Sequence, residues 1–214
     1  MPTTSTGNFV SEYLVSFLIS YLIGSFPTAF IVVKQTSRLD IRTAGSGNVG
    51  GRNALEVTGK KWVGAAVVLI DVMKGAASIA AAQWWFPGYS VAYSAAMAGA
   101  VTGHCYPVWL RFRGGRGLAT AAGVFLMAHP VWPAVWLMVY FTAQKLTGNV
   151  HRSSVIALAG LPVIGWLVPD HLTAMAVPAS FTVESFLAAA TFPMAVCISR
   201  HIKPLMGIDE THAP

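Results

Sequence analysis

Residues 103–117 read GHCYPVWLRFRGGRG, and the stretch from Gly103 to Gly117 joins an apolar run to a loop rich in arginine and glycine. The run before it is compatible with hydrocarbon, whereas Arg111, Arg113 and Arg116 follow closely one after another. Charged side chains are costly inside a bilayer, so they gather at its surface or in a functional site. The stretch therefore predicts a helix that ends at a membrane boundary and a loop with a chemical role.

The composition places the whole chain in a membrane. Of 214 residues, 55% are hydrophobic and only 10% are charged, and the mean hydropathy is +0.59. Soluble domains carry roughly 25% charged residues. Cys105 and Cys197 lie in or beside apolar runs, which does not support a disulfide framework. No Lys or Arg precedes the first apolar run, so we expect that segment to be retained rather than cleaved as a signal.

The chain has a net charge of +6 and a pI near 9.6. The positions of its cations indicate membrane topology rather than nucleic-acid binding as the reason. Thirteen of the 14 Lys and Arg residues fall in four polar segments: Lys34, Arg38, Arg42, Arg52, Lys60 and Lys61; Arg111, Arg113 and Arg116; Lys145 and Arg152; Arg200 and Lys203. The intervening turns at 87–88, 129–130 and 169–170 carry none. Basic loops face the cytoplasm in membrane proteins. We therefore expect a multi-pass protein of the cell (inner) membrane with its functional residues on the cytoplasmic face.

Apolar runs of spanning length predict the helices. They occur at about residues 12–33, 62–86, 91–110, 154–169 and 177–199, and each approaches the roughly 20 residues that a bilayer core requires. The segment 118–144 is broken by His129-Pro130 and Pro133, and it lies between two basic loops, so it crosses an even number of times. Two short helices or a shielded re-entrant hairpin meet that condition, and we favour two crossings.

The expected fold is an all-α polytopic integral membrane protein of one domain, residues 1–214. It is a compact bundle of seven transmembrane helices with short central helices, an external N-terminus and a cytoplasmic C-terminus. Ala and Gly are frequent in the apolar runs, and small residues let membrane helices approach closely.

A second glycine-rich loop, residues 45–53, reads GSGNVGGRN. Backbone N–H groups beside a guanidinium fork are how proteins hold phosphate. Gly45, Gly47 and Gly50 also spell a dinucleotide fingerprint, but that motif needs a preceding strand and a βαβ unit. An apolar helix precedes the loop here, so phosphate binding is the better interpretation. The alternative is a flexible turn with a solvated Arg52.

The arginine loop has similar alternatives. A juxtamembrane basic cluster can bind lipid headgroups only, yet simple electrostatic docking needs no glycine, whereas close backbone approach to a phosphoryl group does. An RGG-type nucleic-acid segment fits the letters but is too short. His104 is either a satisfied interior histidine or a general base. Asp71 and Lys74, three residues apart, form either a structural ion pair or a substrate-binding cation.

Other enzyme classes lose support. No His has an Asp five residues later, as in the soluble glycerolipid acyltransferases, and there is neither a Gly-x-Ser-x-Gly elbow nor a His-Glu-x-x-His zinc helix.

Together these residues resemble the bacterial acyl-phosphate-dependent glycerol-3-phosphate acyltransferases, the small seven-helix PlsY family. Residues 45–53 with Gly59-Lys60-Lys61 are similar to its first cytoplasmic motif, and Asp71, Lys74 and Gly75 follow at the expected distance. Residues 103–120 resemble the second motif, and residues 153–155 the third. The resemblance covers most of the chain.

The resemblance implies transfer of a fatty acyl group from acyl phosphate to the 1-hydroxyl of sn-glycerol 3-phosphate, without a cofactor or a metal. The products would be lysophosphatidic acid and inorganic phosphate. Its partners would be the two substrates and membrane lipid. Carried over, the catalytic residues are Ser46, Asn48, His104, Arg116, Ser154 and His201. The substrate-binding and phosphate-binding residues are Gly45, Gly47, Gly50, Arg52, Asn53, Lys74, Arg113, Gly114, Gly115, Gly117 and Thr120.

In that scheme Arg116 takes the position of the family's usual lysine, and Arg113 with the glycines surrounds the leaving phosphate, where charge grows. With no carboxylate in either loop, the donor's own phosphate is expected to accept the hydroxyl proton.

The chain departs from the family pattern in two places. Arg52 stands for the usual Thr and Glu56 for an Arg, and after His201 the family's Asn is missing from a shortened C-terminal motif. A different acceptor, an inactive paralogue, or a transporter or binding protein for phosphorylated amphiphiles are the alternatives. Transporters typically show inverted repeats, whereas the polar residues here crowd one membrane face.

Overall fold

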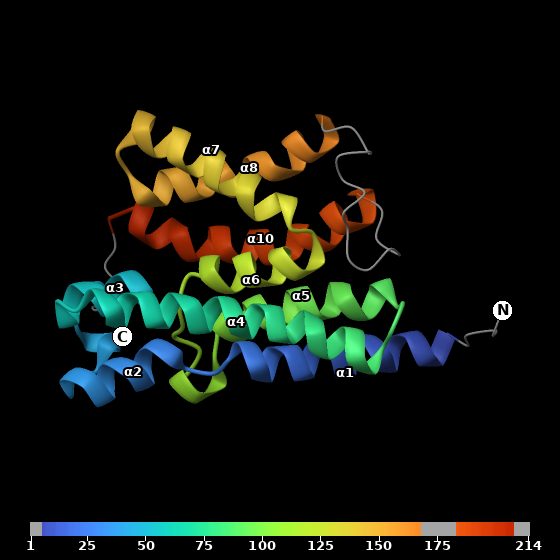
Figure 1. Cartoon of the computed structure of the whole chain (residues 1–214), viewed down its shortest axis with the longest axis horizontal. Coiled ribbons are helices and arrows are strands. Elements are labelled where there is room, and N and C mark those ends of the chain that lie inside the picture. The colour runs from blue at the N-terminus through green and yellow to red at the C-terminus, as the bar shows by residue number, and fades with distance from the viewer. Residues whose placement is uncertain (1–5, 168–182, 208–214) are drawn as a thin grey trace.

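The computed structural model describes residues 6–167 and 183–207, and every regular element in them is helical (Figure 1). In chain order these are α1 (Thr6–Gly24), α2 (Thr28–Ser37), η1 (Ile41–Thr43), α3 (Gly51–Thr58), α4 (Lys61–Trp85), α5 (Ser90–Cys105), η2 (Val108–Leu110), α6 (Leu118–Ala128), α7 (Val131–Thr147), α8 (Val150–Leu167) and α10 (Val183–Leu205). The all-helical prediction is confirmed for this part of the chain.

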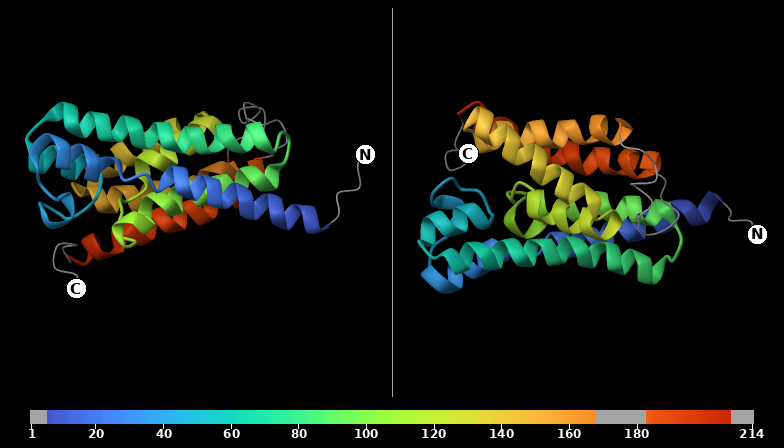
Figure 2. Two further views of the ribbon diagram at one scale, coloured as in Figure 1. Left: turned by 90° about the horizontal axis from the view of Figure 1, so that it is seen from below. Right: turned by 45° about the horizontal axis from the view of Figure 1, so that its top comes forward.

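The helices pack as an elongated bundle whose long members run roughly along its long axis (Figures 1 and 2). The closest neighbours are α1 with α5, α4 with α6, and α7 with α8, while α10 packs on both α5 and α8. The short helix α3, the junction of α7 and α8 and the last turns of α10 lie at the same end of the bundle (Figure 1). Three of the four basic segments therefore meet at that end.

Glycines bring the helix backbones together, as the small-residue pattern predicts. A Cβ added at Gly99 or Gly103 of α5 would collide with the backbone oxygen of Phe17 or Tyr21 on α1. Likewise a Cβ at Gly75 of α4 would collide with the backbone of Thr120 on α6. These pairs of helices touch main chain to main chain, which gives dispersion contacts where there is no water to expel.

Among the residues that the structure describes, three segments have the length and apolarity to cross a membrane: Val10–Ser37, Lys61–Trp85 and Glu184–Leu205. Leu118–Ala128 and Val150–Gly165 are shorter apolar helices. Large apolar side chains such as Leu18, Leu69 and Phe141 are exposed on the outside of the bundle. An apolar surface of this extent marks a membrane-facing protein.

The breaks between helices differ in part from the expected runs. The segment 118–144 forms α6 and α7, with the break at His129-Pro130, as expected. The run 12–33 is not continuous, because α1 ends at Gly24 and α2 begins after Pro27. Proline lacks an N–H and cannot continue the hydrogen-bond ladder. For the same reason α5 ends at Cys105, two residues before Pro107. The expected turn at 169–170 lies outside the described residues.

Candidate functional site

A polar cavity of about 280 Å³ opens at the end of the bundle where the basic segments meet. Three separate stretches of the chain contribute its lining: Ser46, Arg52, Asn53, Glu56, Arg116, Gly148, Asn149, Val150 and His151. The two glycine-rich loops recognised in the sequence thus reach one cavity together with the junction of α7 and α8. Two guanidinium groups at one opening favour an anionic ligand.

Asn53 organises the first loop. This buried side chain donates from Nδ2 toward the backbone oxygens of Ile41 (3.2 Å), Ala44 (3.0 Å) and Asn48 (3.0 Å), and its Oδ1 accepts the N–H of Ser46 at 3.0 Å. A primary amide has two hydrogens and an oxygen with two lone pairs, so both hydrogens and one lone pair are used within the protein. Asn53 therefore shapes the loop that presents Ser46 to the cavity.

The short helix η1, which directly precedes the same loop, has a charged cap. Asp40 caps η1 by accepting the N–H of Arg42 at 3.0 Å, and the Arg42 guanidinium lies 2.7 Å from its second oxygen. The hydrogen bond from the Arg42 side chain lowers the pKa of the Asp40 carboxyl below its ordinary value of 3.8, although burial acts in the opposite direction. The loop thus begins at a charged cap.

Arg52 and Glu56 form an ion pair one turn apart on α3. Arg52 Nε donates to Glu56 Oε1 at 2.8 Å, and both side chains are about half exposed. Exposed pairs of this spacing contribute only about 0.3–0.5 kcal/mol. An incoming phosphate can therefore replace the carboxylate as the partner of Arg52.

The second loop delivers Arg116 through a tightly held backbone. The N–H groups of Gly114 and Gly115 donate to the carbonyl oxygens of Cys105 and His104, each at 3.1 Å. A Cβ at Gly115 would lie 2.7 Å from the backbone oxygen of Val49. In this structure these glycines serve close packing between the two loops, and their N–H groups are already bonded.

Arg200 of α10 reinforces the same turn. Its Nε and Nη2 donate to the backbone oxygens of Gly115 (3.2 Å) and Gly114 (3.1 Å), and its guanidinium lies over the Tyr106 ring. The last helix is thereby connected to the loop that carries Arg116.

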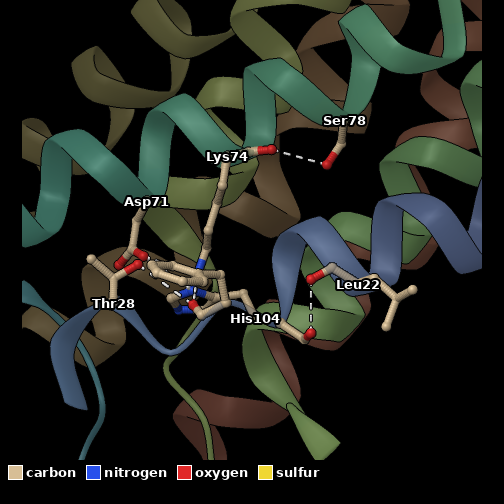
Figure 3. A network of polar contacts seen from close by, with 8 residues as sticks. Leu22, Thr28, Asp71, Lys74, Ser78 and His104 are labelled. Carbon is tan, nitrogen blue, oxygen red and sulfur yellow. Dashed lines mark hydrogen bonds and ion pairs between the residues drawn. The ribbon is translucent and has the colours of Figure 1, made fainter. Parts of the chain in front are cut away.

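Asp71, Lys74 and His104 lie in a separate buried network (Figure 3). Lys74 Nζ is 2.9 Å from Asp71 Oδ1 and donates to the backbone oxygen of Phe26 at 3.1 Å, while His104 Nδ1 is 3.7 Å from the same Asp71 oxygen. The residues surround a void of only about 10 Å³. Lys74 thus joins α4 to the break between α1 and α2, and neither it nor His104 lines the larger cavity.

The other predicted site residues divide by position. Ser46, Arg52, Asn53 and Arg116 line the cavity. Five polar residues do not line it, and of these Asn48, Thr120, Ser154 and His201 are buried whereas Arg113 is exposed. Ser154 Oγ donates to the backbone oxygen of Val150 at 2.8 Å.

Sequence reasoning missed the residues from Gly148 to His151. They occupy the basic segment between Lys145 and Arg152, on the side of the membrane expected for the site, so their position was a usable signal. His151, half-buried at the start of α8, lines the cavity, and its Nδ1 lies 3.0 Å from Nδ1 of the buried His201.

An apolar pocket of about 90 Å³ lies close to the arginine loop. It begins at Leu118, two residues after Arg116, and runs between α6, α7 and α8. Its lining is Leu118, Ala121, Ala122, Phe125, Pro133, Trp136, Leu137 and Leu158. A polar, cationic cavity and an apolar pocket therefore border the same short stretch of chain, at Arg116 and Leu118 respectively.

Known proteins of one family match this chain. Residues 14–206 match the family model described as glycerol-3-phosphate acyltransferase. A protein of that name from Syntrophotalea carbinolica is 34% identical over 192 residues, which is 90% of this chain and 91% of the relative. Another from Gluconobacter oxydans is 43% identical over 136 residues, which cover 61% of this chain and 64% of that relative.

Solved structures agree with the sequence matches. Two crystal structures of PlsY, described as an integral membrane glycerol 3-phosphate acyltransferase, superpose with TM-scores of 0.73 and 0.72 at 27% and 26% identity. The matches cover 92% of this chain and 94% and 93% of those structures. One is the glycerol 3-phosphate form and the other the lysophosphatidic acid form.

Proposed function

Since this chain belongs to the glycerol-3-phosphate acyltransferase family, we propose that it transfers a fatty acyl group from an acyl phosphate to the 1-hydroxyl of sn-glycerol 3-phosphate. The products are lysophosphatidic acid and inorganic phosphate. The observation that carries the proposal is the placement of Arg52 and Arg116 at one cavity, with an apolar pocket beginning two residues beyond Arg116. A substrate with a phosphate head and an acyl chain matches both.

The reaction needs a nucleophilic hydroxyl, a polarised acyl carbonyl and a stabilised phosphate leaving group. The glycerol oxygen forms a bond to the acyl carbon, and the bond from that carbon to the phosphate oxygen breaks. Negative charge grows on the departing phosphate, where a guanidinium such as that of Arg116 is most effective. Ser46 and Asn149 line the same cavity and provide polar groups that can orient the acceptor.

We further propose the membrane arrangement: one domain, seven crossings, an external N-terminus and a cytoplasmic C-terminus in the cell membrane. The clustering of basic segments at the cavity end supports a cytoplasmic site under the positive-inside rule. Arg113, a predicted residue that is exposed beside the arginine loop, would then border the acyl-phosphate head.

A second acceptor is favoured by one observation, the carboxylate of Glu56 at the cavity. A negative group beside a phosphate-binding arginine weakens attraction to a dianionic acceptor. A polyol without phosphate is the alternative acceptor.

The deciding experiment measures phosphate release by the purified protein in lipid mesophase or detergent, supplied with palmitoyl phosphate, with and without sn-glycerol 3-phosphate. Mass spectrometry identifies the lipid product. We expect acceptor-dependent release with lysophosphatidic acid formed in equal amount. Release that ignores glycerol 3-phosphate but depends on glycerol would favour the alternative acceptor, and no transfer by folded protein to either acceptor would refute the proposal.

A further inference from the structure

We propose that His151 is the general base of this acyl transfer and that His201, bonded behind it, fixes the tautomer that makes it one. The inference rests on the proposed function. It replaces the expectation, drawn from the two glycine-rich loops alone, that the donor's phosphate removes the hydroxyl proton. The structure brings a third stretch of chain to the cavity, and that stretch carries an imidazole.

His151 and Glu56 are the two ionisable groups at the cavity that are not arginines. The charged groups there are Arg52, Glu56 and Arg116. Glu56 already accepts a hydrogen bond from Arg52 at 2.8 Å, so its carboxylate is engaged by a cation. A neutral imidazole has a nitrogen lone pair that can accept a proton, and histidine is the residue most often used as a general base.

When both rings are neutral, the contact between the two histidines is a single N–H···N hydrogen bond. The Nδ1 atoms are 3.0 Å apart and the rings are tilted by 56°. One nitrogen must carry the hydrogen while the other presents a lone pair. If His151 donates from Nδ1, its Nε2 holds the lone pair that a base requires.

His201 is built to orient its neighbour. Its side chain is buried on α10, and its Nε2 has no hydrogen-bond partner among the described residues, so the bond to His151 is the one that fixes the ring there. An acceptor behind a catalytic imidazole holds it in the required tautomer, as an aspartate does in serine hydrolases. His201 is therefore a positioning residue.

The proton balance is complete without another reactant. His151 Nε2 takes the proton from the 1-hydroxyl as the glycerol oxygen bonds to the acyl carbon. When the bond to phosphate breaks, the imidazolium gives that proton to the departing phosphate. The products are the ester and hydrogen phosphate, and His151 returns to its neutral form.

The test begins with kcat and KM of His151→Gln in the phosphate-release assay. We expect kcat to fall by about 100-fold or more, within the range for loss of a general base, while KM for both substrates stays within about threefold. Exogenous imidazole should partly restore kcat in His151→Ala. Arg152→Ala, an exposed neighbour that does not line the cavity, is the matched control and should resemble wild type.

A second pair of variants tests the positioning role. His201→Asn keeps an acceptor oxygen near the place of Nδ1 and should retain most activity, whereas the apolar His201→Leu should lose about tenfold or more in kcat. In the His151→Gln background, His201→Leu should add little, because the two residues act as one unit. A simple loss of folding would instead add to the first defect.

The outcomes separate this inference from the proposed function. An inactive wild type refutes both. An active wild type with His151→Gln within about threefold of its kcat overturns the general base alone. Equal losses in His201→Asn and His201→Leu, or full additivity with His151→Gln, overturn the positioning role.

Discussion

Arg200 on the last helix donates from its Nε to the backbone oxygen of Gly115 at 3.2 Å, one residue before the arginine that enters the cavity. The same guanidinium reaches Gly114 with Nη2. Two carbonyls facing one planar fork hold the turn in a single orientation. Two segments far apart in the sequence thus share control of Arg116.

Arg200→Lys should lower kcat by about tenfold, because an ammonium keeps the charge but cannot match two carbonyls with a rigid fork. Phosphate release in detergent checks it. Arg152→Ala is the control for a general loss of surface charge. Wild-type turnover in Arg200→Lys would mean that charge rather than geometry matters there.

Arg116→Ala should nearly abolish turnover, since a charge-assisted contact to the leaving phosphate is lost. Arg116→Lys should retain a substantial part of kcat because an ammonium can still face a phosphate. Trp85→Ala, at the far end of α4 and exposed, should behave like wild type. Equal activity in wild type and Arg116→Ala would remove the second loop from the mechanism.

Asn53→Ala should lower both stability and activity, because it leaves three buried or part-buried carbonyls and the Ser46 N–H without their partner. Each unsatisfied buried group costs about 1–3 kcal/mol, so a lower Tm in thermal unfolding should accompany at least a tenfold loss of kcat. If Tm were unchanged while activity vanished, Asn53 would act on the substrate rather than on the loop.

Glu56→Gln should lower KM for glycerol 3-phosphate by a few-fold. Removing the carboxylate releases Arg52 and lessens repulsion of the phosphate, and the pair itself contributes well under 1 kcal/mol. Steady-state kinetics at low and high salt should show the gain shrinking as salt screens the charges. A rise in KM would instead show that Glu56 holds Arg52 in its binding position.

Asp40 should make the stability depend on pH in the acid range. Its pKa is lowered in the folded protein, so its contribution is fully present above the ordinary value of 3.8 and disappears as pH falls through the lowered folded value. Unfolding of wild type and Asp40→Asn between pH 3 and 7 should show a gap at neutral pH that closes on acidification. A constant gap would exclude the carboxyl charge as its cause.

Much of the fold follows from pattern. Apolar runs and the cation distribution predict an all-helical membrane protein, and the break at His129-Pro130 is where the structure places it. The interruption at 25–27 was missed because the apolar run continues through it. Its cause is local: Pro27 has no N–H to donate, and Ser25 donates its hydroxyl to the backbone of Leu22.

Within the site, the sequence predicted the residues that belong to recognisable motifs but not the contacts that depend on tertiary packing. Both glycine-rich loops contribute to one cavity, with Ser46 and Arg116 in its lining. The bonding of the Gly114 and Gly115 N–H groups to α5 was not visible, since it depends on which carbonyls the end of that helix leaves open. The contact of His151 with His201 joins positions 50 residues apart, and only packing of α8 against α10 brings them together.

The main-chain contacts at Gly75, Gly99 and Gly103 affect how conserved positions among relatives should be interpreted. Even alanine at these positions would force the paired helices apart. Selection should therefore keep them invariant in sequences that have exchanged one acceptor for another. An alignment read without the structure would rank such glycines beside Arg116, although what they preserve is the spacing of helices.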